Sequence, residues 1–555
     1  MKFTLAWLKE HLETPAALDE ICARLTMLGL EVEEVVDRAQ DLAAFKVARV
    51  VTVEPHPNAD RLRLCTVETG SGTIRVVCGA PNVRAGMKAV LARPGDTIPA
   101  TGTVLKKSAI RGVESDGMLC SASELLTGDD EEGIIELPAD AKVGEPFAGA
   151  LGLDDPVIDV AVTPNRSDCL GVRGVARDLA AAGVGSLVPR ADTPVPASFK
   201  CPVTVRLDFA PSVRPAPCAM FAGRVVRGVI NRPSPQWLQN RLKAIGLRPI
   251  SSLVDITNYL TIDRARPLHV FDADCLAGNL TVRLAERGQK LMALNGKEYE
   301  LDPDMTVIAD EDGVLSLGGV IGGEPSGCTP ATQNVFLECA LFDPVRTAAT
   351  GRKLGVESDA RYRFERGVDP ASVLPGIEAA TRMIVELCGG EASEVVVAGA
   401  EPDWRRSIAL RPSRVHHLGG VDLPEDRSRA ILEKLGFEVG PADGALDATA
   451  PSWRTDIEIE ADLVEEILRI NGYDGIPPVS LPRETALPKG ALTVLQQRAA
   501  AARRMLAARG MVETVTWSFV AETDARRFGG IDERLRLVNP ISADLAVMRS
   551  SVLPN

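Results

Sequence analysis

The sequence predicts a multidomain protein of the α+β class, and three observations support this prediction. The chain has 555 residues, so roughly three to five domains of ordinary size are expected. Its first 37 residues place apolar side chains at helical spacing, whereas residues 45–146 show short β-rich runs separated by glycine and proline. Beyond residue 400 the pattern mixes helices and strands. Different parts of the chain therefore belong to different structural classes.

Composition limits the class of protein. An apolar fraction of 45% and a charged fraction of 25% are ordinary for a globular chain with a large core. No apolar run reaches the roughly 18 residues of a membrane span, and Met1 leads into an amphipathic segment without a signal-peptide pattern. We therefore expect a cytoplasmic protein with no membrane partner. The 11 cysteines include no Cys-x-x-Cys pair, which argues against zinc ribbons and disulfide frameworks.

Residues 1–38 are expected to form a helical module, because Leu5, Leu8 and Leu12 and later Ile21 and Leu25 recur at helical spacing. Residues 39–150 are expected to form a small barrel, with strands at 46–53, 62–67, 73–78 and 88–92 and a loop at 56–62.

The predicted barrel also carries a local positive charge. Lys106, Lys107 and Arg111 lie beside a glycine-rich corner, and such charge suits contact with a single-stranded or tRNA backbone. A solvated basic loop explains the same residues equally well. The net charge of −14 disfavours broad nucleic-acid binding, so any such site must be local.

The central part of the chain places polar groups inside apolar runs. Asn258 lies in Val254–Tyr259, His269 follows Pro267-Leu268, and Glu338 lies in Gln333–Cys339. These runs read as buried strands, so the three side chains predict a pocket in a central α+β domain at 211–400, with 151–210 as a linking segment packed on it. The alternative is structural: a turn asparagine, a satisfied histidine and an arginine-paired glutamate.

A second polar group follows in a small helical and β domain at 401–478. Asp456, Asp462, Glu465 and Glu466 cluster in sequence, and a helix ending at Asn471-Gly472 would place Asp462, Glu465 and Glu466 on one face. Carboxylate oxygens suit a magnesium ion. An acidic helix face in solvent is the alternative. Residues 479–555 are expected to hold a linker, an arginine-rich helix and a strand at 512–519.

Several motifs resemble a known family. The segments 77–82, 106–112 and 117–121 resemble the tRNA-binding barrel of translation proteins. Met1–Lys9, Thr163–Cys169, Gly318–Glu324, Arg361–Pro370 and Asn539–Ser542 are similar to bacterial phenylalanine–tRNA ligase β subunits, and the resemblance runs essentially end to end.

This resemblance implies an OB-fold barrel at 39–150, an editing domain at 211–400, a winged-helix-like domain at 401–478 and the start of an inactive class II synthetase-like domain at 479–555. It implies an α2β2 heterotetramer that charges tRNA(Phe). In that assembly the α subunit binds ATP and makes phenylalanyl-adenylate, and a magnesium ion at Asp456, Asp462, Glu465 and Glu466 is shared between the subunits. The family continues well past Asn555, so we expect a truncated chain without anticodon binding.

The resemblance also implies that the β subunit hydrolyses tyrosine wrongly attached to the tRNA. The matching positions are Asn258, His269 and Glu338, with Ser358 and Ala360 as substrate-binding residues. Ser358 stands where the family often has threonine. Editing is needed because a pocket for phenylalanine cannot strongly reject a ring that only adds a hydroxyl.

In this interpretation Glu338 accepts the phenol proton, while His269 and Asn258 position the ester and its water. Whether His269 is a general base or an orienting group is left open by the sequence. A free-standing tRNA-binding or trans-editing factor without a synthetase partner is the alternative function, and a plain scaffold would show no hydrolysis.

Overall fold

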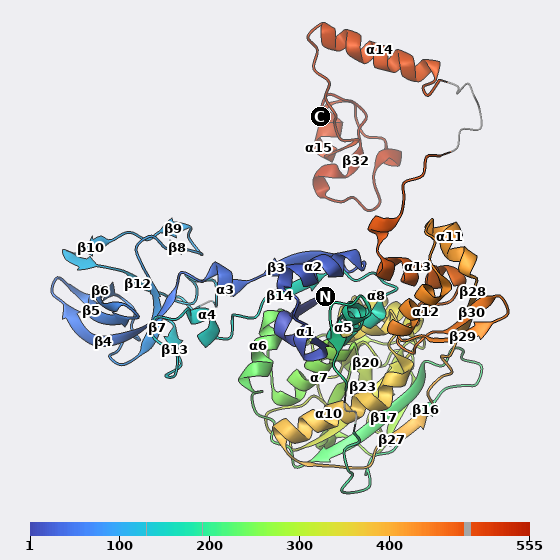
Figure 1. Ribbon diagram of the computed structural model, residues 1–555, viewed down its shortest axis with the longest axis horizontal. Coiled ribbons are helices and arrows are strands. Elements are labelled where there is room, and N and C mark those ends of the chain that lie inside the picture. The colour runs from blue at the N-terminus through green and yellow to red at the C-terminus, as the bar shows by residue number, and fades with distance from the viewer. Residues whose placement is uncertain (129, 191–192, 482–489, 555) are drawn as a thin grey trace. The chain divides into compact units, whose positions relative to one another are not determined.

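The computed structural model describes residues 1–128, 130–190, 193–481 and 490–554 of the chain (Figure 1). The chain divides into two compact units, Met1–Pro477 and Pro478–Asn555. Among the described residues, no helix is both long enough and apolar enough to span a membrane.

The N-terminal part of the first unit combines helices with a small sheet. Its elements are β1 (Lys2–Thr4), α1 (Leu5–His11), β2 (Leu12–Glu13), α2 (Leu18–Met27), β3 (Val32–Val36) and α3 (Arg38–Asp41). Strand β14 (Val157–Val160) lies antiparallel between β1 and β3, and β15 (Ser186–Leu187) pairs with β2. The helical spacing predicts α1 and α2 correctly but misses these strands, because their partners come from a distant part of the chain.

The segment 151–210 therefore serves two parts of the fold. Strand β14 and helix α5 (Val172–Ala181) complete the N-terminal module, whereas β16 (Val205–Asp208) pairs parallel with β19 (Leu280–Leu284) of the central part. The domain boundaries themselves stay a prediction.

Trp7 ties the N-terminal module to helix α7 (Ser252–Arg264). Thr4 begins α1 by accepting a hydrogen bond from the backbone N–H of Trp7 at 3.3 Å. The buried indole stacks on Tyr259 with 4.8 Å between ring centroids, and its Nε1 donates to Asp263 at 2.8 Å. A buried indole N–H needs such an acceptor, so Asp263 fixes the docking of α1.

Residues 45–150 contain a six-stranded antiparallel sheet of order β12-β7-β4-β5-β6, with β13 also paired to β7. The strands are β4 (Lys46–His56), β5 (Ala59–Thr69), β6 (Gly72–Cys78), β7 (Lys88–Ala92), β12 (Met118–Leu119) and β13 (Glu136–Leu137). All four predicted strands are confirmed. The predicted loop at 56–62 is wrong, because a tight turn at Pro57 and Asn58 joins β4 directly to β5. Within the described part of this sheet no ladder joins β6 to β12, so a closed barrel is not found.

Two short hairpins and a helix complete this region. Strands β8 (Thr97–Ile98) and β9 (Thr103–Val104) form one hairpin, and β10 (Ser108–Ile110) and β11 (Val113–Ser115) form the other. Helix α4 spans Phe147–Ala150.

Among the described residues, the central part holds two five-stranded sheets, a separate two-stranded sheet and the helices that cover them. The first sheet has the order β18 (His269–Asp272), β25 (Asn334–Phe342), β17 (Cys218–Arg227), β26 (Glu391–Ala392), and β27 (Val396–Gly399) also pairs with β17. The second has the order β16, β19, β22 (Thr306–Ala309), β23 (Val314–Leu317), β24 (Ile321–Gly322), and β20 (Lys290–Met292) pairs with β21 (Glu298–Glu300). The helices are α6 (Gln236–Ala244), α7, α8 (Pro344–Leu354), α9 (Asp359–Phe364) and α10 (Val373–Cys388).

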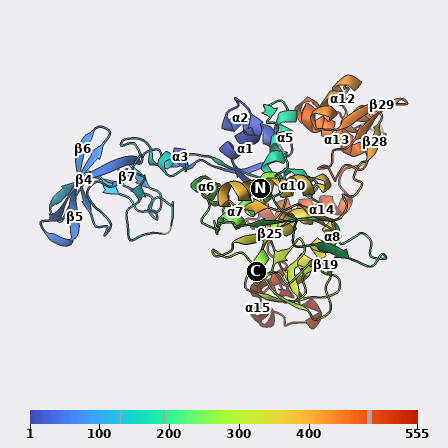
Figure 2. The same ribbon diagram turned by 90° about the horizontal axis from the view of Figure 1, so that it is seen from below.

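Strand β25 runs through the middle of this part and is buried on both faces. Figure 2 shows β25 between helix α10 and strand β19. Because side chains alternate along a strand, Leu337 and Cys339 pack in one core with α7 and α10, while Phe336 and Ala340 pack in another core against the second sheet. Glu338 falls in register with Phe336 and Ala340. The sequence therefore places one glutamate in an otherwise apolar interface.

Residues 401–477 form a small helical and β region. Strands β28 (Ser407–Leu410), β30 (Ala445–Thr449) and β29 (Glu438–Ala442) form a sheet in that order, with helices α11 (Pro412–Gly419), α12 (Glu425–Lys434) and α13 (Glu460–Asn471). This confirms the predicted mixture of helix and strand. The predicted helix end at Asn471 is also confirmed, with Gly472 at its C-cap.

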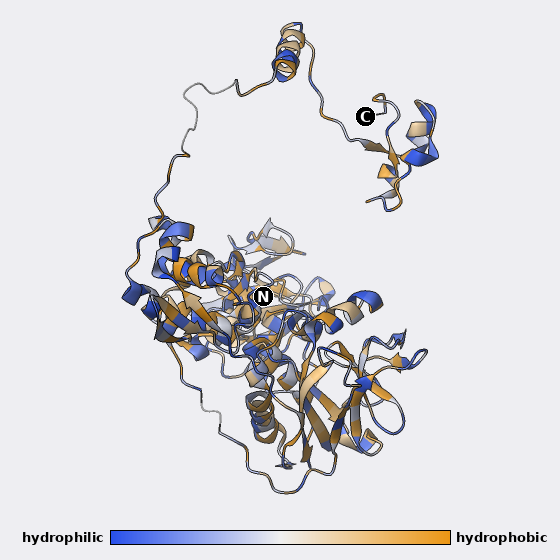
Figure 3. Ribbon diagram, turned by 90° about the vertical axis from the view of Figure 1, so that its right-hand side faces the viewer, coloured by the Kyte–Doolittle hydropathy of each residue, from blue (hydrophilic) through white to orange (hydrophobic). Residues whose placement is uncertain are grey.

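The second unit carries helix α14 (Val494–Ala508), helix α15 (Glu522–Arg527) and a short pairing of β31 (Phe519–Val520) with β32 (Val547–Met548). The arginine-rich helix is confirmed as α14, but the strand predicted at 512–519 is wrong except for its last residue. Part of the predicted linker, 482–489, lies outside the described residues. Figure 3 shows hydrophobic and hydrophilic residues together along α14, and none of its side chains is buried.

Candidate functional site

The structure brings His269 and Glu338 together. They lie directly opposite each other in the antiparallel ladder of β18 and β25, so their side chains share one face of the sheet. Both line a pocket of about 70 Å³, and Ala360 of helix α9 lines it as well. Three of the five predicted editing residues therefore meet at one small cavity.

Glu338 is held in an environment that disfavours its charge. Its side chain is only 6% exposed, and no hydrogen bond to its carboxyl group is found among the described residues. Burial raises the pKa of Glu338 to about 8, although the nearby Arg266 guanidinium lowers it in part. The carboxyl group is therefore mostly protonated at neutral pH, and it can both donate and accept a hydrogen bond.

His269 is neutral in the same pocket. Its Nε2 atom is buried and has no hydrogen-bond partner, and burial lowers the pKa of the imidazole to about 4. The edge of the ring meets Phe271, with centroids 4.5 Å apart and an angle of 85° between the ring planes. A neutral imidazole fixed this way has a free nitrogen to offer to a ligand or water.

A glycine-rich turn closes the pocket against His269. A Cβ atom at Gly322 would lie 2.5 Å from Cε1 and 2.8 Å from Nε2 of His269, which is too close for any side chain. Gly319 has a φ of +72°, a conformation that favours glycine. The turn at 318–323 can approach the imidazole this closely because Gly322 lacks a side chain.

Arg266 was not predicted as part of the site. It does not line the pocket but contacts strand β25 next to Glu338. Its guanidinium is buried and donates to Cys339 Sγ at 3.1 Å, to Ala340 O, and to Ser372 Oγ at 3.3 Å. It therefore braces β25 immediately beside Glu338. Its place just before Pro267-Leu268-His269 is the only sequence signal for this role.

Ser358 and Asn258 do not line the pocket. Ser358 begins α9: its Oγ accepts from the Arg361 N–H at 3.1 Å and donates to Val320 O at 2.6 Å. It thus holds Val320, a pocket residue, in place. Asn258 lies on helix α7 rather than on the predicted strand, and the structure does not bring it to His269 and Glu338.

The four predicted magnesium ligands do not form one group. Among the described residues the only cluster of His, Cys, Asp and Glu with converging ligand atoms is Asp168, Cys169 and Asp178. Asp456 is held by a bidentate contact with Arg454 at 2.8 Å. Asp462 accepts from the backbone N–H groups of Glu458 and Ile459 at 2.8 and 2.9 Å and so begins α13. Glu465 is exposed.

Glu466 takes part in a buried ion network instead. Arg454 Nη2 and Arg469 Nε donate to its Oε1 at 2.9 and 2.8 Å. Burial opposes the charge, but the two guanidinium groups hold the pKa of Glu466 well below its ordinary value. Arginine thus occupies the place that a cation would need, and the residues as arranged do not fit a magnesium ion.

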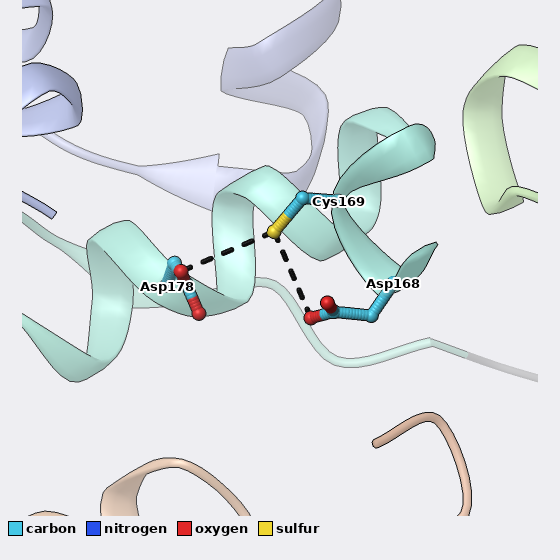
Figure 4. Close-up of side chains that lie close together, drawn as sticks. All are labelled: Asp168, Cys169 and Asp178. Carbon is cyan, nitrogen blue, oxygen red and sulfur yellow. Dashed lines mark hydrogen bonds between the residues drawn. The ribbon is translucent and has the colours of Figure 1, made fainter. Parts of the chain in front are cut away.

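The same explanation applies to the cluster in Figure 4, where Asp168 and Asp178 flank Cys169. Arg166 makes a bidentate contact with Asp168 at 3.0 Å and donates to Asp178 at 2.8 Å. Arg469 donates to Asp178 at 2.8 Å. The carboxylates are already neutralised, so this cluster is part of the ion network and not a metal site.

The predicted tRNA-contacting residues lie at the β10–β11 hairpin: Lys106 and Lys107 come just before β10, and Arg111 lies in the turn. Lys106, Lys107 and Arg111 are exposed. Lys107 Nζ lies 3.1 Å from both Glu114 and Asp116, so its charge is balanced within the hairpin. Lys106 and Arg111 are left to contribute net positive charge.

Comparison with known proteins identifies the family. Family models match four parts of the chain: a putative tRNA binding domain at 45–146, a B3/4 domain at 217–389, a tRNA synthetase B5 domain at 408–473, and a phenylalanyl tRNA synthetase beta chain CLM domain at 478–555. Over its whole length the chain is 58% identical to the phenylalanine–tRNA ligase β subunit of Paramagnetospirillum magneticum and 55% identical to that of Rhodospirillum rubrum, and it covers 69% of each relative. The chain belongs to the phenylalanine–tRNA ligase β-subunit family.

The matched regions coincide with the features described above. The B3/4 match contains His269, Glu338 and Ala360, so the pocket belongs to that domain. The B5 match contains α13 and the buried Glu466. The tRNA-binding match contains the β10–β11 hairpin.

Proposed function

We propose that this chain acts as a subunit of a phenylalanine–tRNA ligase and that its pocket at His269 and Glu338 hydrolyses tyrosine wrongly esterified to tRNA(Phe). The cross-strand pair itself supports this most directly. The two residues face one small pocket. His269 Nε2 is buried without a hydrogen-bond partner, and among the described residues the Glu338 carboxyl group has no hydrogen bond. Buried polar groups usually have partners, so a group kept without one is available to a ligand.

Glu338 would select for the tyrosine hydroxyl. As a neutral acid it offers both a donor and an acceptor to a phenol. A phenylalanine ring would leave this buried group unpaired, at a cost of about 1–3 kcal/mol. Sites built around one hydroxyl reject the analogue that lacks it far better than an apolar pocket rejects an added hydroxyl. The editing pocket thereby spares the correct product.

His269 would orient the attacking water. In the reaction the water oxygen bonds to the ester carbonyl carbon, the bond from that carbon to the ribose oxygen breaks, and the ribose oxygen takes up a proton. With a pKa of about 4, His269 is too weak a base to remove the water proton alone at pH 7. We therefore assign it to accepting a hydrogen bond from the water, with the neighbouring ribose hydroxyl sharing the proton transfer. The geometry gives Asn258 no role in this step.

The remaining partners belong to the same proposal. We infer a cytoplasmic α2β2 assembly in which the α subunit binds ATP and makes phenylalanyl-adenylate, and in which Lys106 and Arg111 contact the tRNA backbone through a barrel of the OB type. The helical region at 401–478 would have a winged-helix-like form. Exposed apolar side chains on α14 of the second unit, Leu495, Met505 and Leu506, favour a protein partner at that helix. Magnesium at Asp456, Asp462, Glu465 and Glu466 would require Arg454 to move away.

The test is deacylation of tyrosyl-tRNA(Phe) beside phenylalanyl-tRNA(Phe), with and without an added α subunit. We expect selective hydrolysis of the tyrosyl ester. Glu338→Ala should abolish the selectivity, and His269→Ala should slow hydrolysis about 100-fold, at the lower end for a group that assists proton transfer.

The matched control is Glu300→Gln, an exposed glutamate on β21, which should leave both rates unchanged. Absence of hydrolysis even with the α subunit present would contradict the editing assignment. Hydrolysis that does not need the α subunit would favour a free-standing editing factor.

A further inference from the structure

A second and larger pocket of about 410 Å³ lies in the first unit and shares no lining residue with the pocket at His269 and Glu338. Its walls come from five segments: helix α5 with the residues just before it, Leu187 and Arg190, the C-terminal end of α7, residues 367–376 and residues 452–453. Five arginines and two aspartates supply its charge. The arginines are Arg173, Arg177, Arg190, Arg264 and Arg266.

The two aspartates offset the positive charge of this lining only in part. Asp168 is engaged by the bidentate contact with Arg166, outside the pocket wall. Asp369 accepts from the Ala371 N–H at 3.0 Å, and burial raises its pKa, which disfavours its charge. The pocket therefore has an excess of positive charge.

The arginines crowd one another. Burial and the charges of Arg190, Arg177 and Arg264 together lower the pKa of Arg173, and the Asp263 carboxylate offsets this lowering only in part. Arg264 has its own contact with Asp263 at 3.5 Å. A negatively charged ligand would relieve this repulsion.

Arg177 is the side chain best placed to receive such a ligand. Its guanidinium lies 4.4 Å from the centre of the Trp453 ring, which fixes its orientation. Its Nε is buried and has no hydrogen-bond partner, and the nearest carboxylate contact, Asp168 Oδ2, is 4.0 Å from Nη2. An oriented guanidinium with an unused donor matches the fork geometry of phosphate recognition.

We infer that this pocket, the arginine pocket, binds a small phosphate-bearing anion such as pyrophosphate or a nucleoside triphosphate. Its volume falls within the roughly 300–1,000 Å³ of small-molecule sites, and the hydroxyls of Ser372 and Ser452 add further polar groups to the wall. The inference does not depend on the editing reaction, because the two pockets have separate linings.

The test is titration of the chain with pyrophosphate and with ATP at constant ionic strength, followed by calorimetry and by tryptophan fluorescence. We expect saturable binding that Arg177→Gln weakens at least about tenfold, the effect of losing one charge-assisted contact. The matched control Arg206→Gln removes an exposed arginine that pairs with Asp208 elsewhere, and it should bind as the unaltered chain does.

Two further measurements locate the ligand and identify its chemical class. Trp453→Phe should reduce the fluorescence response while calorimetric binding persists, which places the ligand beside Trp453. A short RNA with a 5′-phosphate should compete with pyrophosphate only weakly, and the same RNA without the phosphate should not compete. The inference is overturned if neither anion binds saturably, if Arg177→Gln and Arg173→Gln both bind normally, or if only the RNA binds. Deacylation of tyrosyl-tRNA is measured separately, so failure here leaves the editing proposal standing.

Discussion

Two buried glutamates in this chain show opposite behaviour. Glu338 and Glu466 are 6% and 1% exposed, so burial alone would raise the pKa of each. Glu466 contacts Arg454 and Arg469 directly, and its pKa is lowered. Glu338 has Arg266 nearby but no hydrogen bond to it, and its pKa rises to about 8. Contacts with specific partners, rather than depth, decide whether a buried acid is charged.

The comparison separates a structural acid from a candidate functional one. Glu466 is satisfied by the fold and has nothing left to offer a ligand. Glu338 places a carboxyl group without a hydrogen-bond partner in a pocket, and this lowers the stability of the folded state. The following predictions test this contrast.

The largest effect is expected from Glu466→Ala. Removing this carboxylate leaves Arg454 and Arg469 with fewer partners in a buried network, so the free energy of unfolding should fall by about 3–5 kcal/mol. Glu338→Gln keeps the shape of the side chain and removes an acid that the fold disfavours in its charged form, so it should not lower the free energy of unfolding at neutral pH. Urea denaturation followed by circular dichroism measures both. The neighbour Glu465 is exposed, so Glu465→Ala serves as control, and equal losses for Glu465→Ala and Glu466→Ala would refute the network assignment.

The next effect concerns the glycine turn. Gly322→Ala places a methyl group 2.5 Å from His269 Cε1, and such overpacking costs about 1–3 kcal/mol. The imidazole must move, so deacylation of tyrosyl-tRNA should fall more than stability does. Gly440 has open space around it, and Gly440→Ala should leave both properties unchanged. Normal deacylation by Gly322→Ala would remove His269 from the mechanism.

A pH dependence follows from the raised pKa of Glu338. The folded state binds its proton up to about pH 8, whereas the unfolded chain releases it near pH 4.3. The folded state holds more protons in this interval, so stability falls as pH rises through it. His269, with a folded pKa of about 4, acts in the opposite direction below pH 6.5.

The clean interval for Glu338 is therefore pH 6.5–8. There the unaltered chain should lose about 2 kcal/mol more than Glu338→Gln, from about 1.4 kcal/mol per pH unit. Urea denaturation of both chains across this interval measures the difference. Parallel curves would mean that Glu338 is ionised in the pocket.

The smallest effect is expected at Ser358. Its hydroxyl begins α9 and holds Val320 O at 2.6 Å, so Ser358→Ala should cost about 1 kcal/mol, as loss of a helix cap usually does. Ser358→Thr keeps the hydroxyl and should cost less. If both variants are equally stable, the hydroxyl contributes nothing to the pocket wall. Thermal unfolding of the two variants decides between these outcomes.

The strands were predicted where their pattern is local. Strand β7 was predicted at its exact bounds, because its apolar run ends at turn residues. The pair of His269 and Glu338 was also identified, since each is polar within an apolar run. The prediction for Asn258 was wrong for a related reason. Helix α7 is buried on most of its surface, so its apolar residues follow no clear helical period, and periodicity alone cannot tell such a helix from a buried strand.

The four predicted magnesium ligands show a different limit of prediction from sequence. The end of helix α13 at Asn471 was predicted correctly. What the spacing cannot show is that Arg454 and Arg469 turn inward and that Asp178 arrives from another part of the chain. A ligand set read from one segment is incomplete when distant residues supply the opposite charge.

The contact between Asp178 and Arg469 also affects when the protein can complete its fold during synthesis. Asp178 and Arg469 are separated by 291 positions, so a ribosome adding about 5–20 residues per second needs about 15–60 s to supply the second arginine. During that time Asp178 lacks its contact with Arg469, and this part of the buried ion network is incomplete. The first unit therefore completes its fold late in synthesis, and the unfinished chain is most exposed to aggregation in the interval before Arg469 emerges.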